Sequence, residues 1–122
     1  MANKQTVPFV DTQTIRAAAT GTSTFDYNLQ GVDRASLQLN STFSIGGSTD
    51  VITLQISNDG VHFVGFATAK TVTLTGGTTD SALFELGAID YVFLRVFMAA
   101  PSAGTLAMQG VLYGVATSVQ NV

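Results

Sequence analysis

The fold class of this chain is decided by the stretch Val51-Ile-Thr-Leu-Gln-Ile-Ser-Asn-Asp-Gly-Val-His-Phe63. Its first half alternates apolar and polar residues, which places three aliphatic side chains on one face of an extended strand, namely Ile52, Leu54 and Ile56. The alternation stops at three residues that tolerate the positive φ of a tight turn, namely Asn58, Asp59 and Gly60. A second apolar segment begins directly after them. The stretch therefore predicts a β-hairpin with these three residues as its structural turn.

The rest of the chain repeats this pattern of short alternating segments and turn residues. No segment has the period of an amphipathic helix, and nine segments are predicted as strands: 13–18, 23–29, 34–43, 51–57, 61–67, 71–75, 81–86, 91–98 and 105–114. Many short strands separated by Gly, Asn, Asp, Ser and Pro are typical of an all-β, antiparallel two-sheet β-sandwich. The pattern leaves open whether the topology is a jelly roll or immunoglobulin-like.

The domain organisation follows from the length and from the first residues. A chain of 122 residues fits one domain, and no linker or charge run divides it. Residues 1–12 are polar and contain Pro8, so they are expected to form an N-terminal arm that lies across a neighbouring subunit. Residues 13–122 are expected to form a single β-sandwich domain.

The composition describes a surface with few charges. Hydrophobic residues make up 46% of the chain but charged residues only 11%, against about a quarter in an ordinary soluble domain. Such a surface lacks the mixed charges that keep lone domains apart, so much of it is expected to be covered by other subunits. The net charge of -3 and only five basic residues provide no electrostatic footprint for a phosphate backbone. We therefore expect no nucleic-acid partner.

The sequence also bears on where the protein acts. It contains no cysteine, it begins without the apolar segment of a signal peptide, and it has no run of eighteen apolar residues. Neither secretion nor a membrane partner is predicted. A Thr- and Gly-rich β-protein without an export signal fits a virus particle that is assembled in the host cytoplasm, so the expected location is the virion.

No combination of residues in the sequence carries catalytic or metal chemistry. His62 is the only histidine, and the eight acidic residues are widely spaced and lie mostly in or beside turns. A calcium loop would need an alternating series of aspartates, which is absent, and the glycine pairs lack the lysine of a phosphate loop. We therefore expect no catalytic residue, no metal site, no cofactor and no enzymatic activity.

Two predicted strands are apolar on both faces and are the candidates for a partner interface. In 91–98 the candidate row consists of Tyr91, Phe93, Arg95 and Phe97; in 61–67 it consists of His62, Val64 and Phe66. Aromatic residues with arginine are enriched at interface hot spots. In the alternative interpretation both strands are central and are covered by the opposite sheet and by a loop. Arg95 is expected to pair with a carboxylate such as Asp90 or Glu85, or with a partner's carboxylate.

Three segments together resemble a known family. They are Leu54-Gln-Ile-Ser-Asn-Asp-Gly-Val-His-Phe63, Tyr91-Val-Phe-Leu-Arg-Val96 and Gly104-Thr-Leu-Ala-Met-Gln-Gly-Val-Leu-Tyr113. In this order they resemble small β-sandwich virion proteins of tailed bacteriophages, over residues 34–114. The first and second segments are also similar, more distantly, to discoidin-like carbohydrate-binding jelly rolls, which usually carry tryptophan and often a disulfide; both are absent here.

The bacteriophage resemblance implies a structural role without catalysis. The function we expect is that of a capsid decoration or cement protein, which stabilises the head by bridging capsomers. Its partners would be further copies of itself and a larger viral shell such as the major capsid protein. The alternative function is that of a tail-fibre or baseplate module, or of a carbohydrate-binding β-sandwich whose partner is a glycan.

Overall fold

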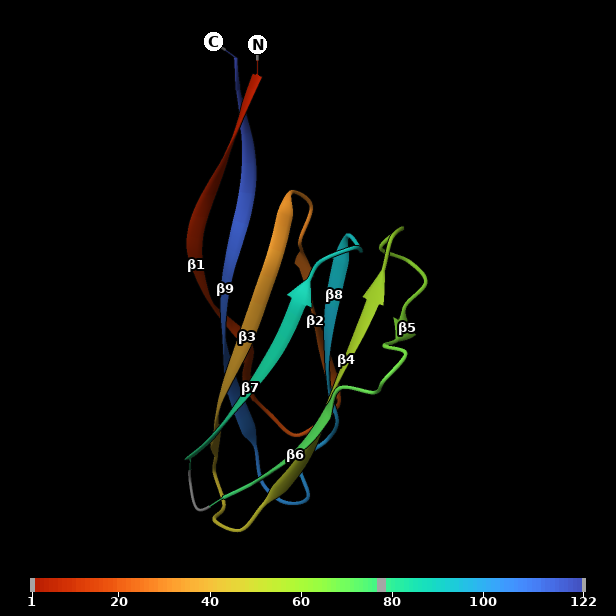
Figure 1. The fold of residues 1–122 in the computed structure, drawn as a ribbon. Coiled ribbons are helices and arrows are strands. Elements are labelled where there is room, and N and C mark those ends of the chain that lie inside the picture. The colour runs from red at the N-terminus through yellow and green to blue at the C-terminus, as the bar shows by residue number, and fades with distance from the viewer. Residues whose placement is uncertain (1, 77–78, 122) are drawn as a thin grey trace.

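In the computed structural model, which describes residues 2–76 and 79–121, the chain forms nine β-strands (Figure 1). The strands are β1 (Ala2–Ala19), β2 (Ser23–Asn28), β3 (Val32–Phe43), β4 (Thr49–Ser57), β5 (Val64–Gly65), β6 (Thr71–Thr75), β7 (Thr79–Ala88), β8 (Phe93–Met98) and β9 (Leu106–Asn121). All strand pairs are antiparallel, and the strands form two sheets. The predicted all-β sandwich is confirmed. Within these residues no helix is long and apolar enough to span a membrane.

The order of the strands identifies the topology. The first sheet has the order β1-β9-β3-β7, and the second has the order β2-β8-β4-β5, with β6 also paired to β4. The pairs are nested: the first strand pairs with the last, β2 with β8, β3 with β7, and β4 with β6. Such nesting arises when one long antiparallel ribbon folds over on itself, which is a jelly roll. The structure therefore decides between the two predicted topologies.

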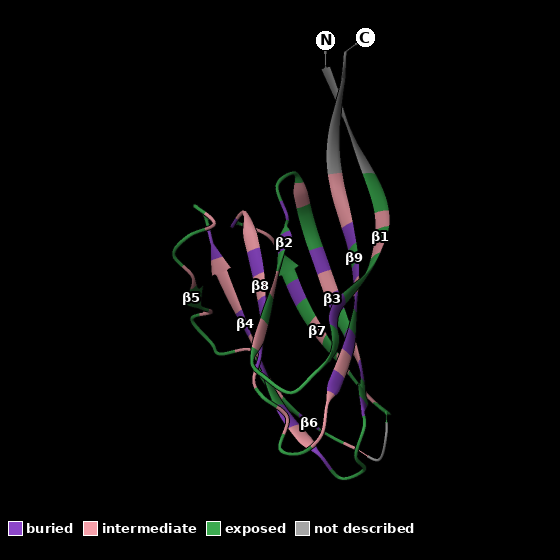
Figure 2. Ribbon diagram, turned by 180° about the vertical axis from the view of Figure 1, so that it is seen from behind, coloured by how far each residue is buried: buried purple, intermediate pink, exposed green. Residues whose placement is uncertain are grey.

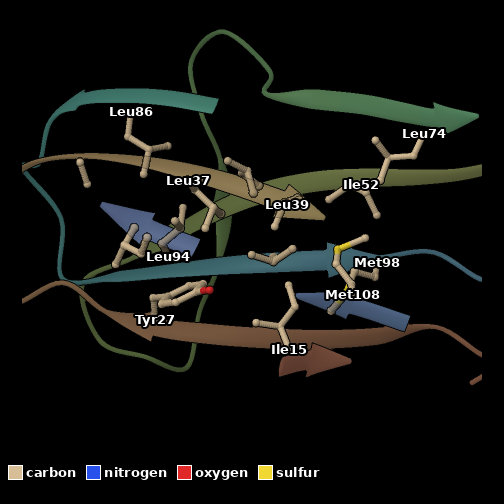
Figure 3. Close-up of a cluster of buried hydrophobic side chains, with 14 of the residues drawn as sticks. Ile15, Tyr27, Leu37, Leu39, Ile52, Leu74, Leu86, Leu94, Met98 and Met108 are labelled. Atoms are coloured by element: carbon tan, nitrogen blue, oxygen red, sulfur yellow. The ribbon is translucent and has the colours of Figure 1, made fainter. Parts of the chain in front are cut away.

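The core lies between the two sheets and follows the alternation of the sequence. Leu37, Leu39, Ile52 and Leu54 are fully buried, as the pattern predicts. In β8 the buried residues are Leu94, Val96 and Met98. Figure 3 shows that the labelled side chains, among them Leu37, Ile52 and Leu94, come from strands of both sheets and meet in one layer. Figure 2 shows buried and exposed positions alternating along β3. Each sheet therefore has one face in the core and an opposite, outer face.

The strands at the two ends of the chain are longer than predicted. β1 pairs with β9 from Ala2, opposite Asn121, to Ala19, opposite Leu106, so the predicted segments 13–18 and 105–114 are only parts of these strands. The two strands extend as a twisted ribbon beyond the rest of the sandwich, with the two termini side by side at its tip (Figure 1). Residues 2–12, predicted as an arm, lie within this ribbon. That they contact a neighbouring subunit stays a prediction.

The predicted hairpin is only partly correct. The strand expected over 61–67 is reduced to the two residues of β5, which pair with Gln55 and Ile56. The region from 58 to 63 forms a loop, because the backbone N–H groups of residues 59 to 62 bond to the side chains of Ser57, at the end of β4, and of Asp59, and not to the backbone of β4. The remaining edge of β4 is covered by β6, whose Thr71 to Thr75 pair with Thr53 to Thr49.

Gly110 of β9 faces the core at a place where only glycine fits. A methyl group built on its Cα would overlap the hydroxyl of Tyr27 and would lie 3.1 Å from a methyl group of Ile15. Tyr27 and Ile15 are both buried, and Figure 3 shows the two side chains near each other in the core. The Tyr27 hydroxyl has no hydrogen-bond partner among the described residues, so its removal costs little.

We expect Gly110→Ala to destabilise the fold by about 1–3 kcal/mol, because the core must move to admit the methyl group. The double variant Gly110→Ala/Tyr27→Phe removes the overlap with the hydroxyl and leaves the ring carbon at 3.4 Å, but the methyl group still lies 3.1 Å from Ile15, so part of the stability should return. Urea unfolding of the two single variants and the double variant measures this coupling. Additive losses of stability in the double variant would show that the overlap with the hydroxyl does not cause the effect.

Candidate functional site

The outer face of the second sheet carries most of the predicted interface residues. In β8, Phe93, Arg95 and Phe97 alternate with fully buried residues and are half-buried on the outer side. The register places polar residues of the neighbouring strands beside them: Asp26 of β2 and Gln55 of β4 both lie opposite Arg95. We call Phe93, Arg95 and Phe97 the β8 row.

Tyr91 does not belong to this row, although it was predicted in it. Its side chain is only 9% exposed and packs edge-to-face against Phe66, with the ring centroids 5.7 Å apart. The reason is that β8 begins at Phe93, and the bend before it breaks the alternation on which the prediction rested. Burial, together with the nearby charge of Asp90, raises the pKa of Tyr91 to about 12. Tyr91 is a core residue.

Arg95 is held by two groups of the same chain. Its Nε donates to Oδ1 of Asp26 at 2.8 Å, and its Nη2 donates to Oδ2 at 3.1 Å. The guanidinium also stacks on the ring of Phe63, 3.7 Å from the centroid. The hydrogen bond to Asp26 raises the pKa of Arg95 further. The expectation of a carboxylate partner was correct, but the partner is Asp26 and not Asp90 or Glu85, because β2 is the strand that flanks β8.

The second predicted row is not one face of a strand. His62 and Val64 are exposed, the latter by 62%. Phe66 instead packs against the core, and the ammonium of Lys70 lies 5.4 Å from the centroid of its ring. Because the segment is mostly loop, its alternate residues point in different directions. Only His62 and Val64 remain available to a partner.

The predicted turn is a loop tied together by Asp59. Its Oδ1 accepts hydrogen bonds from the Ser57 hydroxyl at 2.8 Å and from the backbone N–H groups of Val61 and His62 at 2.9 and 2.8 Å. These bonds, above all those with His62, hold the pKa of Asp59 well below its usual range. Gly60 has a φ of +75°, so its predicted positive φ is confirmed. Asn58 and Asp59 do not need this conformation.

The contact of Ser57, Asp59 and His62 invites comparison with a catalytic triad. In a triad the histidine bonds to the serine hydroxyl and takes its proton, while the carboxylate orients the histidine. Here Ser57 donates to Asp59 directly, and Nδ1 of His62 bonds to the other oxygen of Asp59 at 2.8 Å. The carboxylate is therefore the central group, and the Ser57 hydroxyl donates to this carboxylate, a weak base because its pKa is lowered, and not to the imidazole. The shallow hollow of about 220 Å³ beside these residues has no activated nucleophile in its wall.

Metal ligands are not gathered in this part of the molecule. Among the residues that the structure describes, no group of three or more His, Cys, Asp or Glu side chains lies close enough to hold a metal ion.

The structure adds two residues that sequence reasoning missed. Phe63 was predicted as a strand residue but lies in the loop over Arg95, and Asp26 was not considered for the site. The ring of Phe93 lies 3.1 Å from the position of a Cβ built on Gly60, so the same loop also contacts Phe93. The signal for Asp26 was present, because it alternates with Phe25 and Tyr27 on a predicted strand. Which strand lies beside it was not apparent from the sequence.

No protein-family model matches this sequence, and no curated protein matches it. Solved structures share its fold. The crystal structure of the SPBc2 prophage-derived protein YomS matches with a TM-score of 0.60 at 11% identity, over 88% of this chain and 95% of that chain. The structure of desmodium yellow mottle tymovirus matches with a TM-score of 0.52 at 6% identity, over 98% and 91% of the two chains. The structure of the T13 IBDV viral particle matches with a TM-score of 0.54 at 18% identity, over 92% of this chain and 34% of that chain. At these identities the similarity to a prophage-derived protein and to two viral proteins is one of fold.

Proposed function

We propose that this protein is a non-enzymatic structural protein of a virion, and specifically a capsid decoration or cement protein of a bacteriophage. In this role further copies of the chain and a larger shell, such as the major capsid protein, are its partners. The observation that carries the proposal is the outer face of the second sheet, where two phenylalanines remain half-exposed on a flat, preorganised strand surface. The fold shared with viral proteins supports it.

The β8 row has the physical properties of an attachment surface. The ion pair of Arg95 with Asp26 cancels the two charges, and the stacking of Phe63 holds the guanidinium in place. A partner that covers this face therefore does not bury an unpaired charge, which would cost several kcal/mol. Phe93 and Phe97 then provide the apolar contact. The rest of the chain carries few charges, so electrostatic repulsion between closely packed copies is weak.

The position of the aromatic side chains favours this function over glycan binding. A sugar-binding domain is expected to expose its aromatic residues at loops, where they form a platform for the sugar ring. Here Phe93 and Phe97 lie on β8, which has a neighbouring strand on each side, and they flank Arg95, two of whose N–H groups already donate to Asp26. A strand face of this kind suits a protein contact.

The mechanism is stabilisation by burial of surface. Each Å² of apolar surface removed from water contributes about 25 cal/mol before the costs of association are subtracted. Each contact of the β8 row therefore contributes only a modest free energy of binding. A shell repeats this contact at every symmetry-related site. A cement protein that bridges neighbouring capsomers opposes their separation at all these sites together.

The test is binding to shells of the encoding virus from which this protein has been removed. We expect Phe93→Asp and Phe97→Asp each to weaken co-sedimentation with these shells by at least about tenfold, because each buries an unpaired carboxylate in the contact. Circular dichroism checks that both variants fold. Ile45→Asp, which adds the same charge at an exposed apolar residue in the loop between β3 and β4, serves as the control.

The outcome that contradicts the proposal is equally specific. If both folded variants bind shells as the parent does, the β8 row is not the attachment surface. If the parent protein itself does not bind the shells but binds glycans on an array, the carbohydrate-binding alternative replaces the proposal. Phe66→Asp is not a suitable test, because Phe66 packs against Tyr91 and its loss would impair folding.

A further inference from the structure

The outer face of the first sheet is almost free of charge. Where the structure describes the side chains, most outward positions of β1, β9, β3 and β7 are occupied by Thr, Gln, Asn, Ser and aliphatic residues, with side-chain hydrogen bonds among them: Asn40 accepts from Gln38 and Ser81 and donates to Gln109. Three large hydrophobic residues are exposed on this face, Val10 by 64%, Leu83 by 62% and Tyr113 by 49%. Val10 lies directly opposite Tyr113 in the register, and an exposed apolar patch on a soluble protein commonly marks a contact surface.

Among the residues whose side chains the structure describes, two charged residues interrupt this face, and they have opposite signs. They are Arg34 of β3 and Glu85 of β7, and both are exposed. Glu85 lies opposite Ser36, which is two residues along β3 from Arg34, so the two are diagonal neighbours. Neither forms an ion pair with any described residue, in contrast to Arg95. Together with Tyr113 they border a shallow hollow of about 370 Å³.

The backbone around these two residues is shaped by irregularities. The register of β3 shifts between Ala35 and Ser36 relative to β7, and between Val32 and Arg34 relative to β9. Gly87, at the first of these shifts, has a φ of +67°. Such bulges change the direction of a side chain and occur near functional surfaces. Here one bulge lies on each side of Arg34 along β3, and the bulge between Ala35 and Ser36 lies between Arg34 and the level of Glu85.

We propose that this face binds a second copy of the same chain about a two-fold axis that passes beside Ser36, so that Arg34 of each copy pairs with Glu85 of the other. In a two-fold contact, Arg34 of the first copy lies against Glu85 of the second, and Glu85 of the first lies against Arg34 of the second. The two charges that are unpaired in each copy are therefore both paired in the dimer. A strongly acidic or basic partner would leave one of them opposed by a like charge. The proposal identifies the contact for the self-association in the proposed function.

The size of the face agrees with this partner. Four strands about 4.8 Å apart, each contributing about nine residues of about 3.3 Å, present about 600 Å² per copy. Crystal-packing contacts mostly bury less than about 400 Å² per partner, and standard specific interfaces bury about 800 Å². The face alone is thus of intermediate size, as expected for a contact that forms reversibly in solution. Val10, Leu83 and Tyr113 supply its apolar part.

The test is a charge exchange measured by sedimentation equilibrium of the purified chain, without any shell. We expect the parent to dimerise, and Arg34→Glu and Glu85→Arg each to weaken the dimer by at least about tenfold, because each places like charges together. The double variant Arg34→Glu/Glu85→Arg restores opposite charges across the axis and should return to within about threefold of the parent. Association of the parent should also weaken with added salt.

The results separate this inference from the proposed function. Single variants that lose dimerisation and a double variant that regains it support the two-fold pairing. A monomeric parent at high concentration, or a double variant as weak as the single variants, overturns it. Neither result depends on the β8 row, so shell binding by Phe93→Asp and Phe97→Asp can fail or succeed independently. Circular dichroism confirms that the exposed substitutions leave the fold intact.

Discussion

Replacing Arg16 with methionine is expected to destabilise the fold by about 3–5 kcal/mol, because it removes one buried and four partly buried hydrogen bonds, four of them to backbone carbonyl groups. Arg16 is 4% exposed. Its five N–H donors have five acceptors: Nε donates to the carbonyl of Leu106 at 3.0 Å, Nη1 to the hydroxyl of Ser23 and the carbonyl of Ala99, and Nη2 to the carbonyls of Ala19 and Gly21. One side chain thus ties together the end of β1, the start of β9 and the segment after β8.

Urea unfolding measures the effect as a lower midpoint with an unchanged slope. Arg16→Lys is the first comparison, and it should recover only part of the loss, since an ammonium cannot reach five acceptors in the planar arrangement of a guanidinium. Arg34→Met, at protein concentrations where the chain is monomeric, is the matched control for an exposed arginine on β3. Equal stability of Arg16→Met and this control would show that the buried hydrogen bonds contribute nothing.

Replacing Asp50 with asparagine is expected to stabilise the protein at pH 8 by about 2–3 kcal/mol, and to make almost no difference near pH 4. Asp50 of β4 is 2% exposed, and neither of its carboxyl oxygens has a hydrogen-bond donor among the described residues. The nearby charge of Arg16 lowers the pKa of Asp50, but burial has the larger effect and raises it to about 6. Arg16 cannot donate to it, because its donors are all used elsewhere.

The direction of the pH dependence follows from this raised pKa. Between the ordinary value of 3.8 and about 6 the folded state holds a proton that the unfolded state has lost. The stabilising contribution of the protonated acid is complete below pH 3.8 and is lost as the pH rises through about 6. A difference of about two pKa units corresponds to about 3 kcal/mol, and asparagine, which is always neutral, avoids this loss.

Thermal unfolding of the parent and Asp50→Asn across pH 4 to 8 measures the difference directly. At pH 8 the variant should melt roughly 6–10 °C higher in a chain of this length. Asp59, whose pKa is lowered, loses its stabilising contribution as the pH falls, but it is present in both proteins, so its effect cancels in the difference. A difference that is independent of pH would show that Asp50 stays ionised, or stays neutral, throughout this range.

The acid and the arginine are also expected to be coupled. Removing the positive charge of Arg16 takes away the one influence that assists ionisation of Asp50 apart from the adjacent backbone N–H of Val51. In Arg16→Met the pKa of Asp50 should therefore rise further. The gain in stability of Asp50→Asn, which begins at the ordinary pKa of 3.8, should then level off at a higher pH and reach a larger value in the Arg16→Met background.

The candidate site was predicted in part. Outward positions for Phe93, Arg95 and Phe97 follow from alternation with buried aliphatic residues, and the structure agrees. Tyr91 and Phe66 were assigned to outward rows but pack against each other at the core, because neither lies in a regular strand. The exposed face that includes Val10, Leu83 and Tyr113 was missed altogether. These residues lie on three different strands, far apart in the sequence, and none stands out within its own segment.

Most of the strands, and the direction of most of their side chains, could be predicted from the sequence. Alternation has a period of two residues, so a local stretch such as 51–57 already specifies which side chains lie together. Glycine at position 60 likewise specifies a left-handed turn residue, because other residues adopt that conformation at a cost. These properties depend on near neighbours in the chain, and so they could be predicted without knowledge of the remaining strands.

Only the tertiary structure decided which strands lie beside each other and what covers each outer face. β1 pairs with β9 across almost the whole chain, and Asp26 meets Arg95 from a strand 69 residues away. Each antiparallel pairing is chosen by how well whole sheets bury their apolar faces against one another, which is a property of all nine strands together. The nested jelly-roll order, the buried Arg16 and the unpartnered Asp50 all follow from that collective packing.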